Sequence, residues 1–171
     1  MSKRKKSPIK LKNTGKSTRI TNDNKPKNDQ DEKVSFKFEY NNWLKSTQTN
    51  DFYNYLRDEK EFIKHIIYIF HELVPGIDVK TFSQHKHIHP IRGEQKKIVD
   101  KAISTIHGNI QADDLWQLGQ KGGLRLICNK LNNSYIPLII DYHHTIYPSE
   151  KHNERDIGKY NYCPIDYYKK K

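Results

Sequence analysis

The sequence has few cysteines and no long apolar run. Its two cysteines, Cys128 and Cys163, stand 35 positions apart with no Cys-x-x-Cys pair, so we expect small buried side chains in a reducing compartment rather than a disulfide. The longest apolar stretches, 66–70 and 135–140, fall far short of the roughly 20 residues that span a bilayer. The basic start has no apolar segment of a secretion signal behind it. These absences predict a cytoplasmic protein that does not enter a membrane.

Several catalytic signatures are also missing. The chain contains no glycine-rich phosphate loop, no Gly-x-Ser-x-Gly motif and no dinucleotide-binding fingerprint. Nucleotide hydrolysis and serine-triad chemistry are therefore not expected, and we predict no cofactor.

Positive charge is abundant and concentrated at the start of the chain. The 171 residues include 31 Lys or Arg and 20 Asp or Glu, a net charge of +11 with the nine histidines neutral. Residues 1–33 hold a net +7, four hydrophobic residues and no aromatic, whereas 34–171 hold a net +4. The first segment cannot bury enough apolar surface to fold. We predict a disordered basic tail over 1–33 and one folded domain over 34–171.

The basic tail has two interpretations. Its first 19 residues contain eight cations and no acid, with a cluster at Lys3, Arg4, Lys5 and Lys6. Such a segment can contact nucleic-acid phosphates, and it can equally serve only to keep the protein in solution.

Two helices are predicted in the first half of the domain. Apolar residues recur at spacings of three and four over 50–74 with an interruption at Glu59, which indicates one helix, or two with Asp58 and Glu61 as a capping box. Pro75-Gly76 ends this pattern. A second apolar periodicity over 91–106 begins near Gly93 and ends at His107-Gly108. Its outward face carries three candidate nucleic-acid contacts, which are Lys96, Lys97 and Lys101.

Strand patterns follow the second helix. Segments 115–118, 124–131 and 135–147 favour three antiparallel strands, with the turn of a hairpin at 132–134 and with Pro137 at an edge or a bulge. The order of elements predicts an α+β domain, in which helices pack on a small antiparallel sheet. We divide it into a helical extension over 34–93, a helix and sheet over 94–147, and a Tyr- and Lys-rich surface segment over 148–171.

The densest group of reactive side chains lies around the last predicted strand. Its members are Lys121, Arg125, Asp141, Tyr142, His143, His144 and Tyr147. Cleavage of RNA by its own 2′-hydroxyl needs a base, a proton donor for the leaving oxygen, and cations for the charge on phosphorus. His144, Tyr147 and Arg125 can supply these groups, with Lys121 as a further cation.

The two adjacent histidines cannot both serve one face of a strand. Alternation places His143 and His144 on opposite faces unless the strand ends between them, so one of them is expected to be structural. The alternative for any of these Tyr and His side chains is packing at the strand end with hydrogen bonds to the backbone.

The second half of the domain resembles a known superfamily. A helix with outward lysines precedes Leu-Trp-Gln-Leu, Gly-Leu-Arg-Leu-Ile, a hairpin and a closing Leu-Ile-Ile-Asp-Tyr-His-His-Thr-Ile-Tyr. Over roughly residues 94–147 this order resembles the RelE/ParE toxin superfamily. The resemblance implies an mRNA endonuclease that acts on the ribosome, has Arg125, His144 and Tyr147 at matching places, and is held inactive by an antitoxin partner.

Three histidines at alternate positions form a separate motif. His85, His87 and His89 would share one face of a strand, a spacing that can hold two zinc ligands, and His143 or an acid could complete the shell. Pro90 favours a solvent-facing connector instead.

Three hypotheses for function therefore remain open. The first is a RelE-like toxin that binds RNA or the ribosome and cleaves mRNA without a metal. The second is a non-catalytic module that docks on nucleic acid or an acidic protein through its cationic tail. The third is a metallo-nuclease built on the three histidines.

Overall fold

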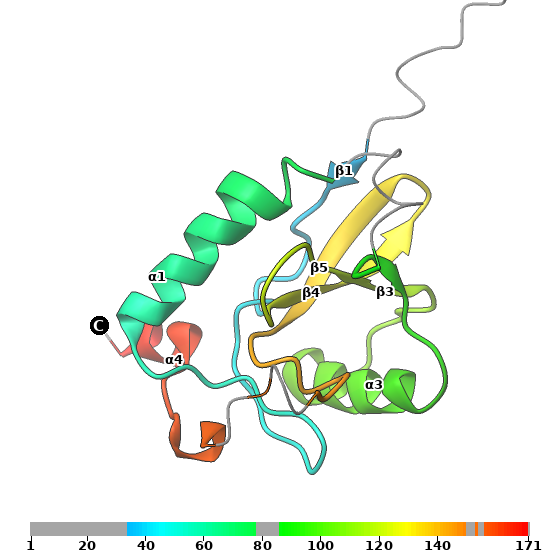
Figure 1. The fold of residues 1–171 in the computed structure, drawn as a ribbon. Coiled ribbons are helices and arrows are strands. Elements are labelled where there is room, and N and C mark those ends of the chain that lie inside the picture. Colours follow the sequence, from blue (N-terminus) through cyan, green and yellow to red (C-terminus); the bar gives the residue numbers. More distant parts are fainter. Residues whose placement is uncertain (1–33, 78–85, 150–152, 154–155, 171) are drawn as a thin grey trace, which may run out of the picture.

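The computed structural model describes residues 34–77, 86–149, 153 and 156–170. Within these ranges the protein is α+β, with three α-helices and a five-stranded mixed sheet of order β1-β5-β4-β3-β2. Figure 1 shows helix α1 (Glu59–Tyr68) on one side of the sheet and helix α3 (Gly93–His107) on the other. The predicted α+β class is confirmed.

Both faces of the sheet are buried, each in its own core cluster. Leu126, Cys128 and Ile140 pack with Ile69 and Leu73, which follow α1 in the chain. Ile127 and Ile139 pack with the apolar side of α3. Burial on both faces explains why β4 (Arg125–Leu131) and β5 (Ser134–Asp141) contain continuous apolar runs, at 126–128 and 135–140, rather than alternating.

Helix α1 begins later than its apolar spacing predicts. The carboxylate of Asp58 accepts a hydrogen bond from the Glu61 amide at 2.9 Å, and the Glu61 carboxylate accepts one from the Arg57 amide at 2.8 Å. The predicted caps therefore start this helix. The prediction of helix over 50–58 is wrong, because Asn54 ties this segment to the Thr47 amide and to the Ile140 carbonyl.

A π-helix continues α1. It spans Ile69–Leu73, and the Val74 amide donates to the Ile69 carbonyl at 2.9 Å. Pro75 and Gly76 follow it as predicted. None of the described helices is long and apolar enough to cross a bilayer.

Helix α3 matches its prediction closely. It spans Gly93–His107, and Gly108 ends it with φ +69° and ψ −146°, a region that side chains disfavour. Its buried residues, Val99, Ala102, Ile103 and Ile106, follow the expected spacing.

The three predicted strands are present, with one boundary corrected. They are β3 (Leu115–Leu118), β4 and β5, all antiparallel, with Asn132 at φ +55° in the hairpin turn. Pro137 lies opposite Cys128 where the register shifts, as the bulge prediction requires. The last strand ends at Asp141 rather than at 147, because the chain turns after Asp141 and the amides of Thr145 and Ile146 donate to its carboxylate.

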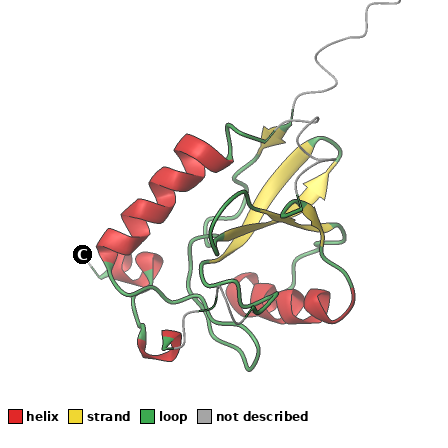
Figure 2. Ribbon diagram, viewed as in Figure 1, coloured by secondary structure: helices red, strands yellow, loops and turns green. Residues whose placement is uncertain are grey.

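The edge strands are short and were not predicted. β1 (Ser35–Phe36) pairs with β5 in parallel, and β2 (His89–Pro90) pairs with β3 antiparallel. The sheet is therefore mixed rather than antiparallel throughout (Figure 2).

The C-terminal segment is only partly a surface layer. Helix α4 (Pro164–Lys169) follows a bridge between Leu56 and Tyr162, and Tyr160 is buried whereas Tyr168 is exposed. Both cysteines are free and buried as predicted. Cys163 accepts a hydrogen bond from the Ser46 amide at 3.3 Å, and burial raises the pKa of the Cys128 thiol well above its usual range.

Candidate functional site

Polar residues from four strands gather where β5 ends and β4 begins. Arg125 lies opposite Asp141, and two pairs further along Ile127 lies opposite Ile139. Because Ile127 packs toward α3, Arg125 and Asp141 lie on that same face of the sheet. We call the group the sheet-end cluster, and its members are His87, His89, Gln117, Arg125, Asp141 and Tyr147.

Arg125 is enclosed and held by its own chain. Only 2% of the residue is exposed, and its Nη1 donates to the carbonyls of Gly122 at 2.7 Å and Leu124 at 2.8 Å. Burial lowers the pKa of the guanidinium, while the charge of Asp141 acts in the opposite direction. In this conformation a phosphate at the surface does not reach Arg125, so its predicted role toward phosphorus lacks geometric support.

A glycine makes room for this arginine. A Cβ at Gly119 would lie 2.7 Å from the Arg125 Cδ and 3.1 Å from its Nε. Such a close approach requires glycine, so a larger residue directly after β3 would displace the Arg125 side chain at the start of β4.

Asp141 organises the turn that follows β5. The residue is completely buried, and its carboxylate accepts hydrogen bonds from the amides of Thr145 at 2.9 Å, Ile146 at 3.0 Å and His143 at 3.2 Å. Burial raises the pKa of Asp141, and these hydrogen bonds counteract that rise. This carboxylate is therefore a structural acceptor that fixes where the two following histidines lie.

His143 and His144 lie in that turn rather than on a strand. His143 is buried, and its Nε2 donates to the Tyr55 carbonyl at 2.7 Å, so this proton is engaged. His144 is half-buried with φ +60°, and Asn153 donates to the carbonyls of both histidines. Since β5 ends first, strand alternation does not separate these histidines. The expectation that one of them has a structural position fits His143.

The structure joins two motifs that the sequence presents separately. The Nη2 of Arg125 lies 3.3 Å from the Nδ1 of His87. The rings of His89 and Tyr147 meet edge to face at 5.2 Å, and burial raises the pKa of the Tyr147 phenol. His89 Nδ1 lies 3.1 Å from the Pro90 carbonyl, which can only accept a hydrogen bond, and Gln117 Nε2 lies 3.3 Å from His89 Nε2. Sequence reasoning missed both His89 as the partner of Tyr147 and Gln117 as the partner of His89.

The metal-site prediction receives no support from the described histidines. His85 lies outside the described residues. Within the described ranges no three His, Cys, Asp or Glu side chains form a group that could hold a metal ion. The guanidinium beside His87 also disfavours a second cation there.

Lys121 lies apart from the sheet-end cluster. Its ammonium pairs with Glu72 of the π-helix and lies 5.7 Å from the centre of the Tyr68 ring, on the α1 side of the sheet. The hydrogen bond with Glu72 raises the pKa of Lys121. This lysine and Arg125 therefore face different layers of the molecule.

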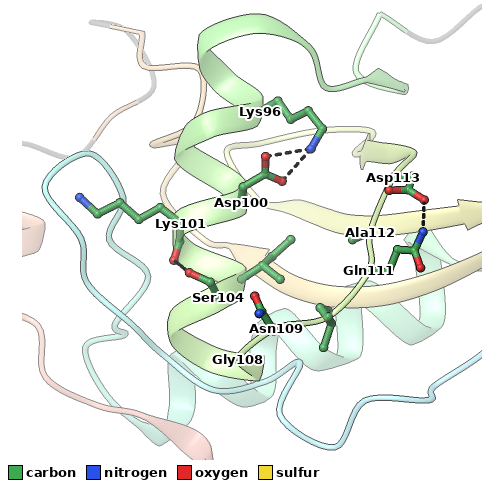
Figure 3. A pocket seen from close by; sticks show the side chains of 11 residues that line it. Lys96, Asp100, Lys101, Ser104, Gly108, Asn109, Gln111, Ala112 and Asp113 are labelled. Carbon is green, nitrogen blue, oxygen red and sulfur yellow. Dashed lines mark hydrogen bonds and ion pairs between the residues drawn. The ribbon is translucent and has the colours of Figure 1, made fainter.

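Two of the predicted nucleic-acid contacts of α3, Lys96 and Lys101, border an open groove of about 730 Å³. Figure 3 shows Lys96 turned toward Asp100, at 2.8 Å, while Lys101 projects away from that pair. Lys97 pairs with Glu94 at 2.7 Å. Lys97 and Lys101 are exposed and Lys96 is half-buried, and two of the three have an acidic neighbour on the same helix. The other predicted contacts, Lys3, Arg4, Lys5 and Lys6, lie outside the described residues.

Comparison with other proteins places this fold in a family. A family model described as "Uncharacterised protein UU032" matches residues 38–170. The chain belongs to the UU032 family. A relative from Ureaplasma parvum serovar 3 (strain ATCC 700970), described as "Uncharacterized protein UU032", is 36% identical over 162 residues, which cover 89% of this chain and 90% of the relative. The UU032 match contains every member of the sheet-end cluster. No solved structure matches the chain.

Proposed function

We propose that this protein is a non-catalytic nucleic-acid-binding protein of the cytoplasm, with single-stranded RNA as its preferred ligand. Its first 33 residues supply most of the phosphate affinity, and the lysines on the outer face of α3 extend the contact. The folded domain over 34–171 carries the α3 lysines and contributes a net charge of only +4.

The observation that supports this proposal is that most of the net positive charge lies in the sequence of residues 1–33, while the cation among the reactive side chains is enclosed. Residues 1–33 hold 11 basic and four acidic residues, whereas Arg125 is 2% exposed and bound to carbonyls of its own hairpin. Lysines bind phosphate by displacing condensed counterions, which needs exposed cations and no fixed site. Cleavage would need a cation held beside the base and the acid.

Salt dependence tests the proposal. Fluorescence anisotropy would follow binding of a labelled single-stranded RNA to the full chain between about 50 and 200 mM salt. Replacing Lys3, Arg4, Lys5 and Lys6 by Gln should lower the slope of log affinity against log salt by about 3, since each neutralised phosphate of a single strand contributes about 0.7.

A matched variant separates the two contact regions. Replacing Lys96 and Lys101 by Gln removes two cations from the folded domain and should lower the same slope by about 1. RNA affinity that is unchanged in both variants would contradict the proposal.

A second function, metal-independent cleavage of RNA by a RelE-like toxin, is favoured by the contact of His89 with Tyr147. An imidazole and a phenol whose ring centres lie 5.2 Å apart can provide a base and a proton donor. On this alternative His89 or His144 takes the proton of the 2′-hydroxyl, and Tyr147 protonates the leaving oxygen. An antitoxin protein would then be the natural partner.

Expression in a bacterial host tests this second function. Growth and translation would be followed for the full chain and for the variants His89→Gln, His144→Ala and Tyr147→Phe. The cleavage hypothesis predicts growth arrest that Tyr147→Phe relieves, because this variant keeps the ring and loses only the hydroxyl. Absence of arrest in the parent, or arrest that persists in all three variants, excludes these residues as the catalytic set.

A further inference from the structure

A ridge of large apolar side chains is exposed along α1 and the π-helix. Ile63 is 49% exposed, Ile67 60% and Phe70 47%, at positions i, i+4 and i+7. Phe38, 44% exposed, extends the ridge sideways, and its ring centre lies 5.6 Å from that of Phe70. We call these four residues the α1 ridge. Contiguous exposed apolar side chains of this size are typical of an interaction surface.

A groove of about 690 Å³ runs beside the α1 ridge. It lies between α1 and the 121–124 loop, and Leu124 and Tyr142 contribute to its apolar lining. Tyr142 is only 4% exposed, and its hydroxyl has no hydrogen-bond partner within the part of the chain that the structure describes. A buried hydroxyl without a partner is costly. This hydroxyl lies beneath the groove surface, so the groove floor is formed by the Tyr142 ring.

The charged groups around the groove are mainly basic. Lys60 and Lys64 are exposed on the ridge side, and Lys121 on the opposite side pairs with Glu72, the acid of the lining. His65 also lines the groove, and burial lowers its pKa, which favours the uncharged imidazole. The groove consequently carries an excess of positive charge along its apolar surface.

We propose that the α1 ridge and its groove bind an acidic amphipathic helix of a partner protein. Apolar side chains spaced i, i+4 and i+7 on the partner would lie against Ile63, Ile67 and Phe70. Glutamates or aspartates beside them would face Lys60 and Lys64. The ridge together with the flanking Lys60 extends about 15 Å, from residue 60 to residue 70, which matches about three turns of a helix.

Charge favours an acidic helix over two other ligands, a second copy of the chain and the chain's own residues 1–33. A second copy of the chain would bring a further net charge of +11 against the same lysines, and the chain's own residues 1–33 carry +7. Both would be repelled by Lys60 and Lys64. The surface lies on the α1 side of the sheet, opposite α3, so the proposal is independent of RNA binding through α3 and the basic tail.

Selection from a displayed peptide library tests the proposal. The library would hold helix-forming peptides of about 14 residues, with randomised Leu, Ile, Phe or Met at i, i+4 and i+7 and with either Glu or Lys at each flanking position. The full chain is the bait. We expect Glu to be enriched over Lys at the flanking positions by about tenfold or more.

Variants of the bait decide where the selected peptides bind. Ile67→Asp should weaken a selected peptide by about tenfold or more, because it places a charge at the centre of the apolar contact. The double variant Lys60→Gln with Lys64→Gln should remove most of the salt dependence. The matched pair Lys96→Gln with Lys101→Gln, on the opposite face, should leave the peptide affinity unchanged. Since Ile67 is largely exposed, its variant should keep the thermal stability of the parent.

Several outcomes would overturn the proposal. No enrichment, enrichment of Lys, or equal binding to the Ile67→Asp chain would remove the acidic helix as the ligand. Sedimentation that shows a dimer lost in Ile67→Asp would assign the face to a second copy. Loss of RNA affinity in Ile67→Asp, with no peptide selected, would assign it to nucleic acid.

Discussion

Arg125 and Asp141 face each other across the first pair of β4 and β5, and neither is accessible to solvent. Each also has several hydrogen-bonding partners of its own, carbonyls for the guanidinium and amides for the carboxylate. Buried charges of this kind are destabilising when one of them is removed, because the other stays behind without compensation. The pair fixes both the start of one strand and the end of the next.

Removing the Asp141 charge should therefore lower stability markedly. Asp141→Asn keeps the size of the side chain but replaces one acceptor oxygen by a donor that faces an amide, so we expect a loss of about 3 kcal/mol in the free energy of unfolding. Urea denaturation measures it. Asp113→Asn, at an exposed carboxylate, is the matched control and should change stability by less than about 0.5 kcal/mol. Equal effects of the two substitutions would contradict the assignment.

His65 makes stability depend on pH. Burial lowers its pKa in the folded state below the ordinary 6.5, so the unfolded chain binds the proton more readily. Stability that is present above about pH 6.5 is then lost as the pH falls toward the lower, folded-state pKa.

The variant His65→Gln isolates this contribution. We expect the parent to lose more stability than His65→Gln between about pH 7.5 and pH 5, by up to about 1.4 kcal/mol for each unit of pKa shift. Urea midpoints at the two pH values measure the difference. An equal loss in both proteins would show that another group is responsible.

Helix α3 is the element that the sequence determines most directly. Its apolar spacing, its start at Gly93 and its end at Gly108 were all readable from the sequence, because each signal is local. The β4–β5 hairpin was predicted for the same reason, through the turn at Asn132 and the bulge at Pro137. Local signals of this kind depend on the preferences of a few adjacent residues.

The end of α3 provides a test at the scale of the element. Gly108 has φ +69° and ψ −146°, and nothing lies within 4 Å of the position that a Cβ would take. Gly108→Ala therefore introduces backbone strain without a clash, and we expect a loss of about 1–3 kcal/mol, measured by thermal unfolding.

Gly158 is the matched control for that substitution. It also has open space around its Cβ position, and it lies in a short 3-10 helix without a positive φ. Gly158→Ala should change stability by less than about 1 kcal/mol. A similar loss in both variants would contradict the strain argument.

Elements that depend on distant partners were missed. Residues 50–57 have helical spacing, but Asn54 bonds to Thr47 and to β5, 86 positions away. β1 and β2 have two residues each and exist only because β5 and β3 offer them an edge. The same limit applies to the site, since the contacts of His87 with Arg125 and of His89 with Tyr147 join segments that are far apart in the sequence.

At the scale of the whole molecule, β1 protects an edge of the sheet. The Ser35 amide donates to the Asn133 carbonyl and the Lys37 amide to the Tyr135 carbonyl, both at 2.9 Å, and Phe36 packs on Tyr135. An uncovered β5 would present unpaired backbone groups and an apolar edge to other molecules.

Two truncations separate the basic tail from this edge. Deleting residues 1–33 keeps β1 and should leave the free energy of unfolding within about 0.5 kcal/mol of the parent. Deleting residues 1–40 should cost at least about 2 kcal/mol through the loss of buried apolar contacts, and it should promote association of the exposed edge. Denaturant melts and light scattering measure the two effects. Equal stability of both truncated chains would show that β1 contributes nothing.

The reactivity of the two buried thiols can report on local unfolding of two different regions. Cys128 lies in the central strand β4 and is completely enclosed, whereas Cys163 lies just before the short helix α4. An alkylating reagent added to the native protein can modify Cys163 once the C-terminal segment detaches, but it reaches Cys128 only when the sheet itself comes apart. Mass spectrometry of the two adducts over time would therefore rank the lifetimes of these two regions without any introduced label.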